Sequence, residues 1–89
     1  RRVVVKAGAE IKLTRKEFDL LAELALDLDK PVPHERLLEG VWGSPDADIR
    51  YLRVYVGQLR DKIEDDPQHP RFVIAEAGFG YRLAKVDGP

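Results

Sequence analysis

DIRYLRVYVGQLRDKIEDD, which spans Asp48 to Asp66, predicts a long helix with two unlike faces. Its apolar residues recur at spacings of four, three and four, as in a helix that turns one side to a core: Leu52, Val56, Leu59 and Ile63. The opposite side carries a different set at the same period: Arg50, Tyr51, Val54, Gly57, Gln58 and Asp61. We therefore expect one face to be buried and the other to face a partner.

The outward side of this helix is basic. Between positions 50 and 62 there are four basic residues and one acidic residue, a local balance of +3, whereas the whole chain has a net charge of −1. The basic residues are Arg50, Arg53, Arg60 and Lys62. Arg and Gln can pair bidentately with base edges, and Gly57 would let a backbone come close to a partner. From this stretch alone, an ordinary amphipathic helix with a basic outer face explains the pattern equally well.

Length and composition exclude several classes of protein. Eighty-nine residues make one domain with a single small core, expected to span residues 1–89. No apolar run approaches the roughly 20 residues of a membrane span, and we expect a cytoplasmic protein without membrane contact. The chain has no cysteine and two histidines far apart, so we expect no metal site and no cofactor. It opens on Arg1 and Arg2 rather than on methionine, which suggests a fragment of a longer chain.

The residues before the long helix predict two strands and a first helix. Residues 1–13 hold two short strand-like stretches joined at Gly8. Thr14 and Glu17 form a T-x-x-E capping box, which begins a helix expected to span residues 15–28. Its expected buried stripe is apolar: Phe18, Leu21, Leu24, Ala25 and Leu28. Its acidic side chains are interpreted as a solvated face, with a contact to a partner protein as the alternative.

The other segments predict a short helix and a final hairpin. An extended link at Pro31–Pro33 precedes a helix over residues 34–42. The long helix occupies residues 48–65 and follows a turn-rich loop. A hairpin spans residues 72–84, with two glycines in its connection.

This order of elements describes an α+β winged helix-turn-helix: a small antiparallel amino-terminal sheet, three helices and a carboxy-terminal β-hairpin wing. The basic helix in that setting favours double-stranded DNA as the partner. A winged helix that binds a protein instead is the alternative, although such a module would not need Arg, Gln and Gly together on one face. An enzyme is not expected, because no nucleophile–base pair, paired carboxylates or phosphate-binding glycine loop is found in the sequence.

Four blocks of sequence carry a family resemblance: LTRKEFDLLAEL (Leu13–Leu24), ERLLEGVWG (Glu35–Gly43), LRVYVGQLRDKIEDDP (Leu52–Pro67) and GFGYRL (Gly78–Leu83). In this order and spacing they resemble the output domain of OmpR/PhoB-class response regulators. Within that class, RYLRVYVGQLR and the residues Pro70–Ile74 look most like the KdpE branch, the regulators of high-affinity potassium uptake.

The resemblance implies a regulatory setting for the domain. It implies an upstream receiver domain, absent from these residues, whose phosphorylation drives dimerisation of the full-length protein. It also implies tandem binding to direct-repeat half-sites, with the isolated domain a monomer. The loop Gly43–Ala47 matches the family's loop that can face RNA polymerase.

Ten residues are the predicted DNA contacts: Trp42, Arg50, Tyr51, Arg53, Val54, Tyr55, Gly57, Gln58, Arg60 and Tyr81. By resemblance, Arg60 matches a phosphate-contacting arginine, and Tyr81 a wing residue that touches phosphate. Trp42 matches a tryptophan that belongs to the core and lies near the DNA backbone. The chain departs from its relatives at Ala77, where many have an arginine, and at Pro33, where they have a side-chain cap. It also has Gly57-Gln58 where some relatives have two arginines.

Several residues keep two interpretations at this point. Gln58 suits either readout of adenine or a solvated position, and Val54 suits either a thymine methyl or a second layer of core. The two tyrosines of the long helix, Tyr51 and Tyr55, are placed either to contact bases or sugars or to pack over the rim of the groove. Arg50 and Arg53 could pair with nearby acids: Asp46, Asp48 or Asp61. Phe79 is interpreted as a residue that packs the final hairpin.

Overall fold

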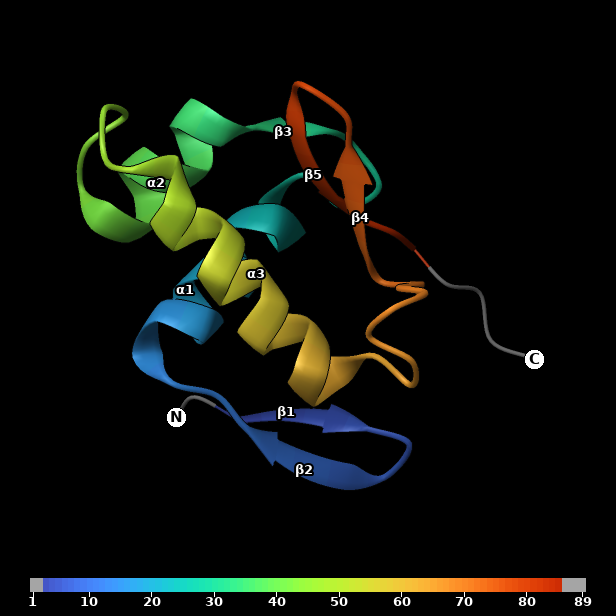
Figure 1. Ribbon diagram of the computed structural model, residues 1–89. Coiled ribbons are helices and arrows are strands. Elements are labelled where there is room, and N and C mark those ends of the chain that lie inside the picture. The colour runs from blue at the N-terminus through green and yellow to red at the C-terminus, as the bar shows by residue number, and fades with distance from the viewer. Residues whose placement is uncertain (1–2, 86–89) are drawn as a thin grey trace.

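Three helices form the centre of the molecule, and two small sheets flank them (Figure 1). The structure is a computed structural model that describes residues 3–85, so Arg1 and Arg2 of the expected strand region lie outside the described residues. The helices are α1 (Arg15–Leu26), α2 (His34–Trp42) and α3 (Ile49–Ile63). The strands are β1 (Val3–Lys6), β2 (Ala9–Lys12), β3 (Val32–Pro33), β4 (Val73–Glu76) and β5 (Gly80–Leu83). This arrangement confirms the predicted winged helix-turn-helix.

The amino-terminal sheet is a two-stranded antiparallel hairpin. Val3 lies opposite Lys12, and Lys6 lies opposite Ala9. The two-residue connection has positive φ at both positions, 51° at Ala7 and 81° at Gly8, as a type I′ turn requires. Figure 1 shows this hairpin across the end of the molecule where α3 finishes.

Helix α1 begins at the expected capping box. The Thr14 hydroxyl accepts the Glu17 amide, and the Glu17 carboxylate accepts the Thr14 amide. The helix ends at Leu26, two residues before the expected end, because Asp27 leaves the helical region with φ −123° and ψ 60°. Asp29 then takes a left-handed φ of 67°. Leu28 therefore lies outside the helix.

The buried side of α1 differs from the predicted stripe. Leu20 and Leu24 are fully buried, whereas Ala25 and Leu28 are exposed. Glu17 belongs to the buried side as well, so the predicted solvated face does not include it. Phe18 and Leu21 flank the core as half-buried residues, which shifts the centre of the buried face toward Leu20. The prediction failed here because several apolar residues on α1 fit more than one helical face.

Helix α2 starts after a strand that the sequence did not reveal. Val32 and Pro33, expected only as an extended link, pair with Tyr81 and Gly80 of β5. The wing is therefore a three-stranded sheet in the order β3-β5-β4. Gly80 allows this pairing, because a Cβ there would lie 1.8 Å from the carbonyl oxygen of Val32.

Helix α3 buries the four residues expected from its period: Leu52, Val56, Leu59 and Ile63. These side chains join one core cluster with Leu20, Leu24 and Leu37 of the other two helices and Val73 of the wing. Complete burial of each such side chain contributes roughly 1.5–3 kcal/mol. Asp48 is the N-cap of α3 and Glu64 is its C-cap, so the helix is shorter at both ends than the expected residues 48–65.

The buried face of α1 can be tested by removing the same side chain at two positions. Leu20→Ala should lower the free energy of unfolding by about 2–5 kcal/mol, because it opens a cavity in the core. Leu28→Ala removes a side chain that is 45% exposed and should change stability by no more than about 0.5 kcal/mol. Urea unfolding followed by circular dichroism measures both. A larger loss for Leu28→Ala than for Leu20→Ala would mean that α1 presents the face first predicted from the sequence.

Candidate nucleic-acid interface

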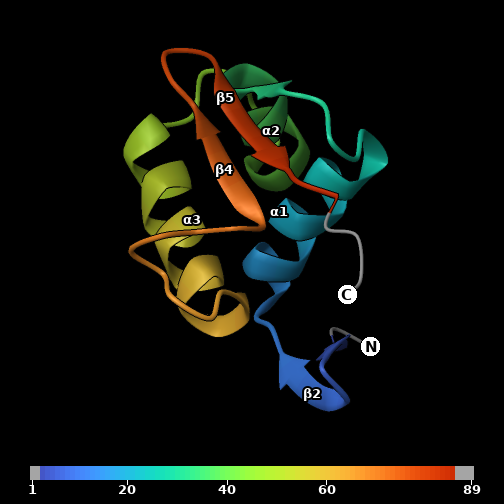
Figure 2. The same cartoon turned by 90° about the vertical axis from the view of Figure 1, so that its right-hand side faces the viewer.

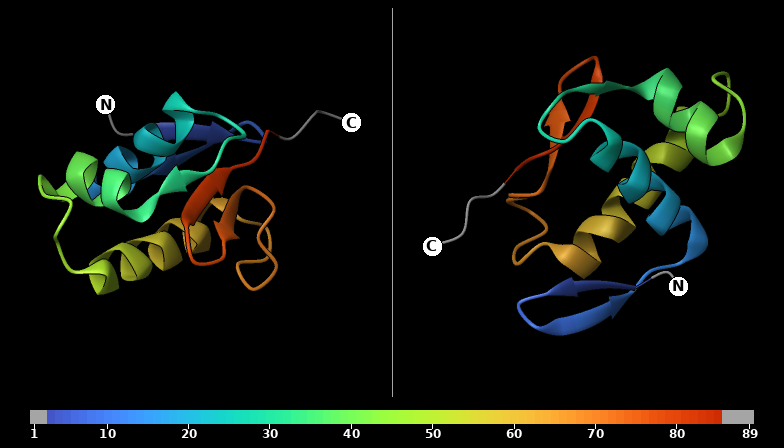
Figure 3. Two further views of the ribbon diagram at one scale, coloured as in Figure 1. Left: turned by 90° about the horizontal axis from the view of Figure 1, so that it is seen from above. Right: turned by 180° about the vertical axis from the view of Figure 1, so that it is seen from behind.

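The outward face of α3 is open to solvent. Figure 3 shows α1 and α2 on one side of α3, and no described element crosses its opposite side. On that side Tyr51 is 57% exposed and Val54 is 53% exposed. Arg53, Gln58 and Asp61 are exposed as well. The second-layer core role for Val54 is therefore wrong, and the residue is available to a partner.

Arg50 forms an ion pair with the residue that caps α3. Its Nε and Nη2 atoms donate to the Asp48 carboxylate at 3.0 and 2.6 Å. These bonds, with the backbone bond from the Arg50 amide, lower the pKa of Asp48 to about 2. The same carboxylate raises the pKa of Arg50. Of the three acids considered from the sequence, Asp48 is the partner.

Arg53 differs from the other basic residues of α3. It is exposed, and it forms no hydrogen bond or ion pair with any residue in the described range 3–85. Its charge is therefore free to meet an anionic partner without breaking an internal contact.

Tyr55 and Trp42 pack against each other between α2 and α3. Their ring centroids lie 5.5 Å apart in an edge-to-face arrangement, and both residues are half-buried. Lys16 of α1 places its Nζ 5.6 Å from the centroid of the Trp42 ring and donates to the Val41 carbonyl at 2.8 Å. Packing is therefore the structural role of Tyr55, whereas Tyr51 is exposed.

Arg60 and Tyr81 come together between α3 and the wing. The Nε and Nη2 atoms of Arg60 donate to the Val73 carbonyl at 3.1 and 2.8 Å. The Arg60 guanidinium carbon lies 5.8 Å from the centroid of the Tyr81 ring. Tyr81 is mostly buried, and its ring meets that of His34 edge-on at 5.7 Å. Both predicted contact residues thus have an internal role that the sequence did not indicate.

Two buried carboxylates also hold α3 in place, and neither was predicted. Glu17 of α1 accepts a hydrogen bond from Lys62 Nζ at 2.5 Å. Glu64 turns its carboxylate to the backbone amides of Arg71, Phe72 and Val73, at distances between 2.8 and 3.1 Å. The capping box was the one local signal that the Glu17 side chain turns inward. The partners of both carboxylates lie too far along the chain for a local pattern to identify them.

Burial of the Glu17 carboxyl group opposes its ionisation, but hydrogen bonds from Lys62 and Thr14 outweigh this effect. The pKa of Glu17 is therefore lowered from its ordinary value of 4.5. Lys62 is occupied by this pair and adds little to the outward charge of α3.

The tip of the wing exposes an aromatic side chain. Phe79 is 48% exposed, so the prediction that it packs the hairpin is only partly correct. Arg82 is not free in the wing, because its Nε donates to Glu76 at 2.9 Å and its Nη1 to Asp29 at 3.1 Å. Figures 1 and 2 show the wing tip toward the same end of the molecule as the amino-terminal end of α3.

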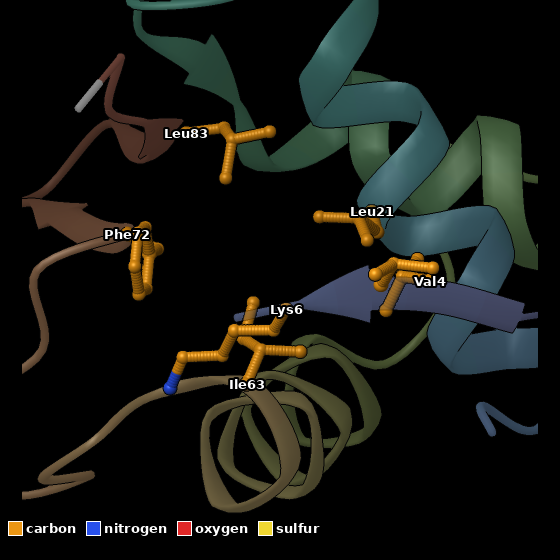
Figure 4. Close-up of a pocket in the computed structure, with 7 residues that line it drawn as sticks. Val4, Lys6, Leu21, Ile63, Phe72 and Leu83 are labelled. Atoms are coloured by element: carbon orange, nitrogen blue, oxygen red, sulfur yellow. The ribbon is translucent and has the colours of Figure 1, made fainter. Parts of the chain in front are cut away.

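A second feature lies away from this face. Figure 4 shows a mostly apolar hollow between the amino-terminal hairpin, α1, the end of α3 and the base of the wing. Its volume is about 160 Å³. Its lining offers little to an anionic backbone: Val4, Val5, Lys6, Leu21, Ile63, Phe72 and Leu83. In residues 3–85, no helix is long and apolar enough to cross a membrane. The same residues hold no group of three or more His, Asp or Glu side chains that could bind a metal ion.

Residues 8–83 match the family described as "Transcriptional regulatory protein, C terminal" (Trans_reg_C). The chain is 49% identical over 81 residues to the transcriptional regulatory protein KdpE of Mycobacterium tuberculosis (strain CDC 1551 / Oshkosh), which covers 90% of this chain and 36% of that protein. The chain therefore spans little more than a third of the length of the curated relatives it matches.

Two solved structures share the fold over 93% of this chain. The response regulator DrrB of Thermotoga maritima, described as an OmpR/PhoB homolog, has a TM-score of 0.84 and 36% identity, with 38% of that chain covered. The RstA DNA-binding domain of Klebsiella pneumoniae, solved in complex with the RstA box, has a TM-score of 0.83 and 28% identity, with 83% of that chain covered.

The pair of Glu17 and Lys62 predicts a pH-dependent stability. Because the pKa of Glu17 is lower in the folded protein than in the unfolded chain, its ionised form stabilises the fold above about pH 4.5. That contribution is lost as the pH falls through the lowered folded value. Glu17→Gln keeps a capping-box side chain and should lower the free energy of unfolding by about 1 kcal/mol at pH 7.

The difference between wild type and Glu17→Gln should shrink in acid. Urea unfolding at pH 7 and at pH 3 measures it, with Glu39→Gln, an exposed acid on α2, as the control. A difference that stays the same at both pH values would show that the charge of Glu17 does not stabilise the fold.

Proposed function

Since the chain belongs to the Trans_reg_C family, the carboxy-terminal domains of transcriptional regulatory proteins, and within it to the OmpR/PhoB class, we propose that it binds specific double-stranded DNA sequences. In this proposal residues 1–89 act as the output domain of a two-component response regulator. The family is one of DNA-binding regulators, and the chain is not an enzyme. The observation that carries the proposal is the outward face of α3, where charged, amide and apolar side chains lie side by side and are exposed to solvent.

The proposed reading surface is the outward ridge of α3 from Arg50 to Gln58, placed in the major groove. Arg50, Val54 and Gln58 follow one another at spacings of four, so they lie along one ridge of the helix. Val54 would contact a thymine methyl, and Gln58 would pair with adenine N6 and N7. Tyr51 stands beside this ridge and would contact a base or a sugar. Asp61 follows on the same side near the carboxy-terminal end, where its charge would keep phosphate away.

Gly57 supports a close approach of the DNA to this ridge. A Cβ at this position would have no protein atom within 4 Å, so the described fold does not itself require a glycine there. A glycine within a helix costs close to 1 kcal/mol relative to alanine. Close contact with the DNA backbone or bases is a reason to retain it.

Phosphate contacts would come from the sides of the reading ridge. Arg53 is unpaired among the described residues and lies on one flank, so it is suited to a phosphate. Arg60 would hold the wing through Val73 and offer its remaining N–H groups to the backbone. Tyr81 and Trp42 would contribute mainly by holding the wing and α2 in position, with Tyr55 packed beneath the rim of the groove.

The regulatory setting is also part of the proposal. A receiver domain would precede this domain, phosphorylation would make the full-length protein dimeric, and two copies would occupy direct-repeat half-sites. The isolated domain would be a monomer. Similarity to KdpE supports potassium-uptake genes as targets. The loop Gly43–Ala47, three of whose five residues are exposed, would face RNA polymerase.

The electrostatic part of this function can be tested by salt titration. A preferred duplex, selected from random sequences with the purified domain, should lose about 10–100-fold in affinity between about 50 and 200 mM salt. Arg53→Ala should lower the slope of log affinity against log salt by about one unit, because one phosphate contact is lost. Fluorescence anisotropy measures both. A winged helix that binds protein instead of DNA would select no duplex at all.

Changing Gln58 or Arg60 to alanine should affect DNA binding in different ways. Gln58→Ala should cost roughly 1–3 kcal/mol on the preferred duplex and little on a scrambled one, because it removes a base contact. Arg60→Ala should weaken both duplexes and lower the free energy of unfolding by about 1 kcal/mol, since the Val73 carbonyl loses its donor. If Gln58→Ala weakens both duplexes equally and Arg60→Ala only the preferred one, α3 is rotated from the orientation proposed here.

A further inference from the structure

One carboxylate at the start of α3 binds both the backbone and the side chain of the same arginine. Oδ1 of Asp48 accepts the Arg50 amide at 2.9 Å, which caps the helix. The same carboxylate also accepts hydrogen bonds from the Arg50 side chain. Nε donates to Oδ1 at 3.1 Å and to Oδ2 at 3.0 Å, and Nη2 donates to Oδ2 at 2.6 Å. Capping requires only the first of these bonds. The other bonds fix the direction of the Arg50 side chain.

These bonds occupy only one edge of the guanidinium group. The group is planar and carries five N–H donors in a fixed fork. Asp48 takes the edge formed by Nε and Nη2, which leaves the edge formed by Nη1 and Nη2 with two parallel N–H groups. The Arg50 side chain is 83% exposed, and Asp48 is its one partner among residues 3–85.

We infer that Asp48 is a positioning residue that presents the free edge of Arg50 to O6 and N7 of a guanine. This inference rests on the proposed function and specifies which base Arg50 recognises. Arginine pairs with guanine through two parallel N–H groups, which is the arrangement that remains free here. Holding the side chain in place before binding reduces the rotamer entropy that is lost when the contact forms.

The surroundings favour a base edge over a phosphate for Arg50. The Asp48 carboxylate lies against the guanidinium group, offsets its charge and would repel a phosphate that approached the same point. A base edge has no net charge and meets no such repulsion. Arg50 also shares its ridge with Val54 and Gln58, whereas Arg53 stands to the side and has no internal anion. The two arginines therefore have different roles: Arg50 contacts a base, and Arg53 contacts the DNA backbone.

The contact also persists over a wide pH range. Hydrogen bonds from the Arg50 side chain and amide lower the pKa of Asp48 to about 2. The carboxylate is therefore ionised at any pH at which the binding would be measured.

Asp48→Asn separates the two roles of the carboxylate. Asparagine caps helices about as well as aspartate, but it has no charge and only one acceptor oxygen for the guanidinium group. Asp46→Asn is the matched control, because it removes the same charge from an exposed loop residue whose side chain does not contact Arg50. Arg50→Ala removes the proposed reader itself.

The experiment measures the affinity of the four proteins for the selected duplex, for its variants with each base pair changed in turn, and for a scrambled duplex. Wild type should prefer guanine at one base pair by about tenfold or more. Arg50→Ala should lose that preference and no other. Asp48→Asn should reduce it several-fold at the same base pair, with an unchanged melting temperature, whereas Asp46→Asn should leave it intact.

Two outcomes would overturn the inference while the proposed function stands. In the first, Arg50→Ala weakens the selected and scrambled duplexes equally and changes no base preference, which makes Arg50 a phosphate contact. In the second, Arg50→Ala abolishes a guanine preference that Asp48→Asn leaves unchanged, so Asp48 positions nothing. If wild type selects no duplex, the proposed function itself fails and the inference fails with it.

Discussion

The backbone of Val73 binds one side chain of α3 and one of its C-cap residue, and these contacts fix the wing against the helix. Arg60 donates to the Val73 carbonyl, and Glu64, one turn later, accepts the Val73 amide. Residues 60 and 64 stand on the same side of the helix because they are four apart. They therefore provide hydrogen-bond partners for the backbone carbonyl and amide at the edge of β4, as a neighbouring strand would. The direction of the wing relative to α3 depends on this arrangement.

The internal contacts of α3 divide the helix into a structural end and an open end. Near its carboxy-terminal end, Arg60 holds the wing and Lys62 holds Glu17 of α1. At its amino-terminal end, Arg53 has no partner in the described chain. The positive charge counted along α3 is thus partly used inside the protein. What remains for a partner lies in the first half of the helix, toward the end of the molecule where Figures 1 and 2 show the wing tip.

The wing also compensates for a weak start of α2. Pro33 occupies the N-cap position of α2 and makes no side-chain hydrogen bond there. Instead, β3 pairs with β5, and the amide of His34 donates to the Phe79 carbonyl at 3.0 Å. Gly80 makes the approach possible, since any side chain would collide with the Val32 carbonyl. The sheet therefore braces both α2 and α3, the two helices of the helix-turn-helix.

The sequence by itself determined the three helices and the two hairpins of this protein, because helix period, capping and turn chemistry depend on residues close together in the chain. It did not show β3, whose pairing with β5 joins segments far apart in the chain. It placed the buried stripe of α3, the capping box of α1 and the outward position of Tyr51 correctly, but it left a second-layer core position open for Val54. Only the tertiary structure decided which charged side chains form internal contacts and which remain available to a partner. Arg60 and Glu17 find their partners 13 and 45 positions away. Such pairings depend on how the helices pack, and no local pattern encodes them.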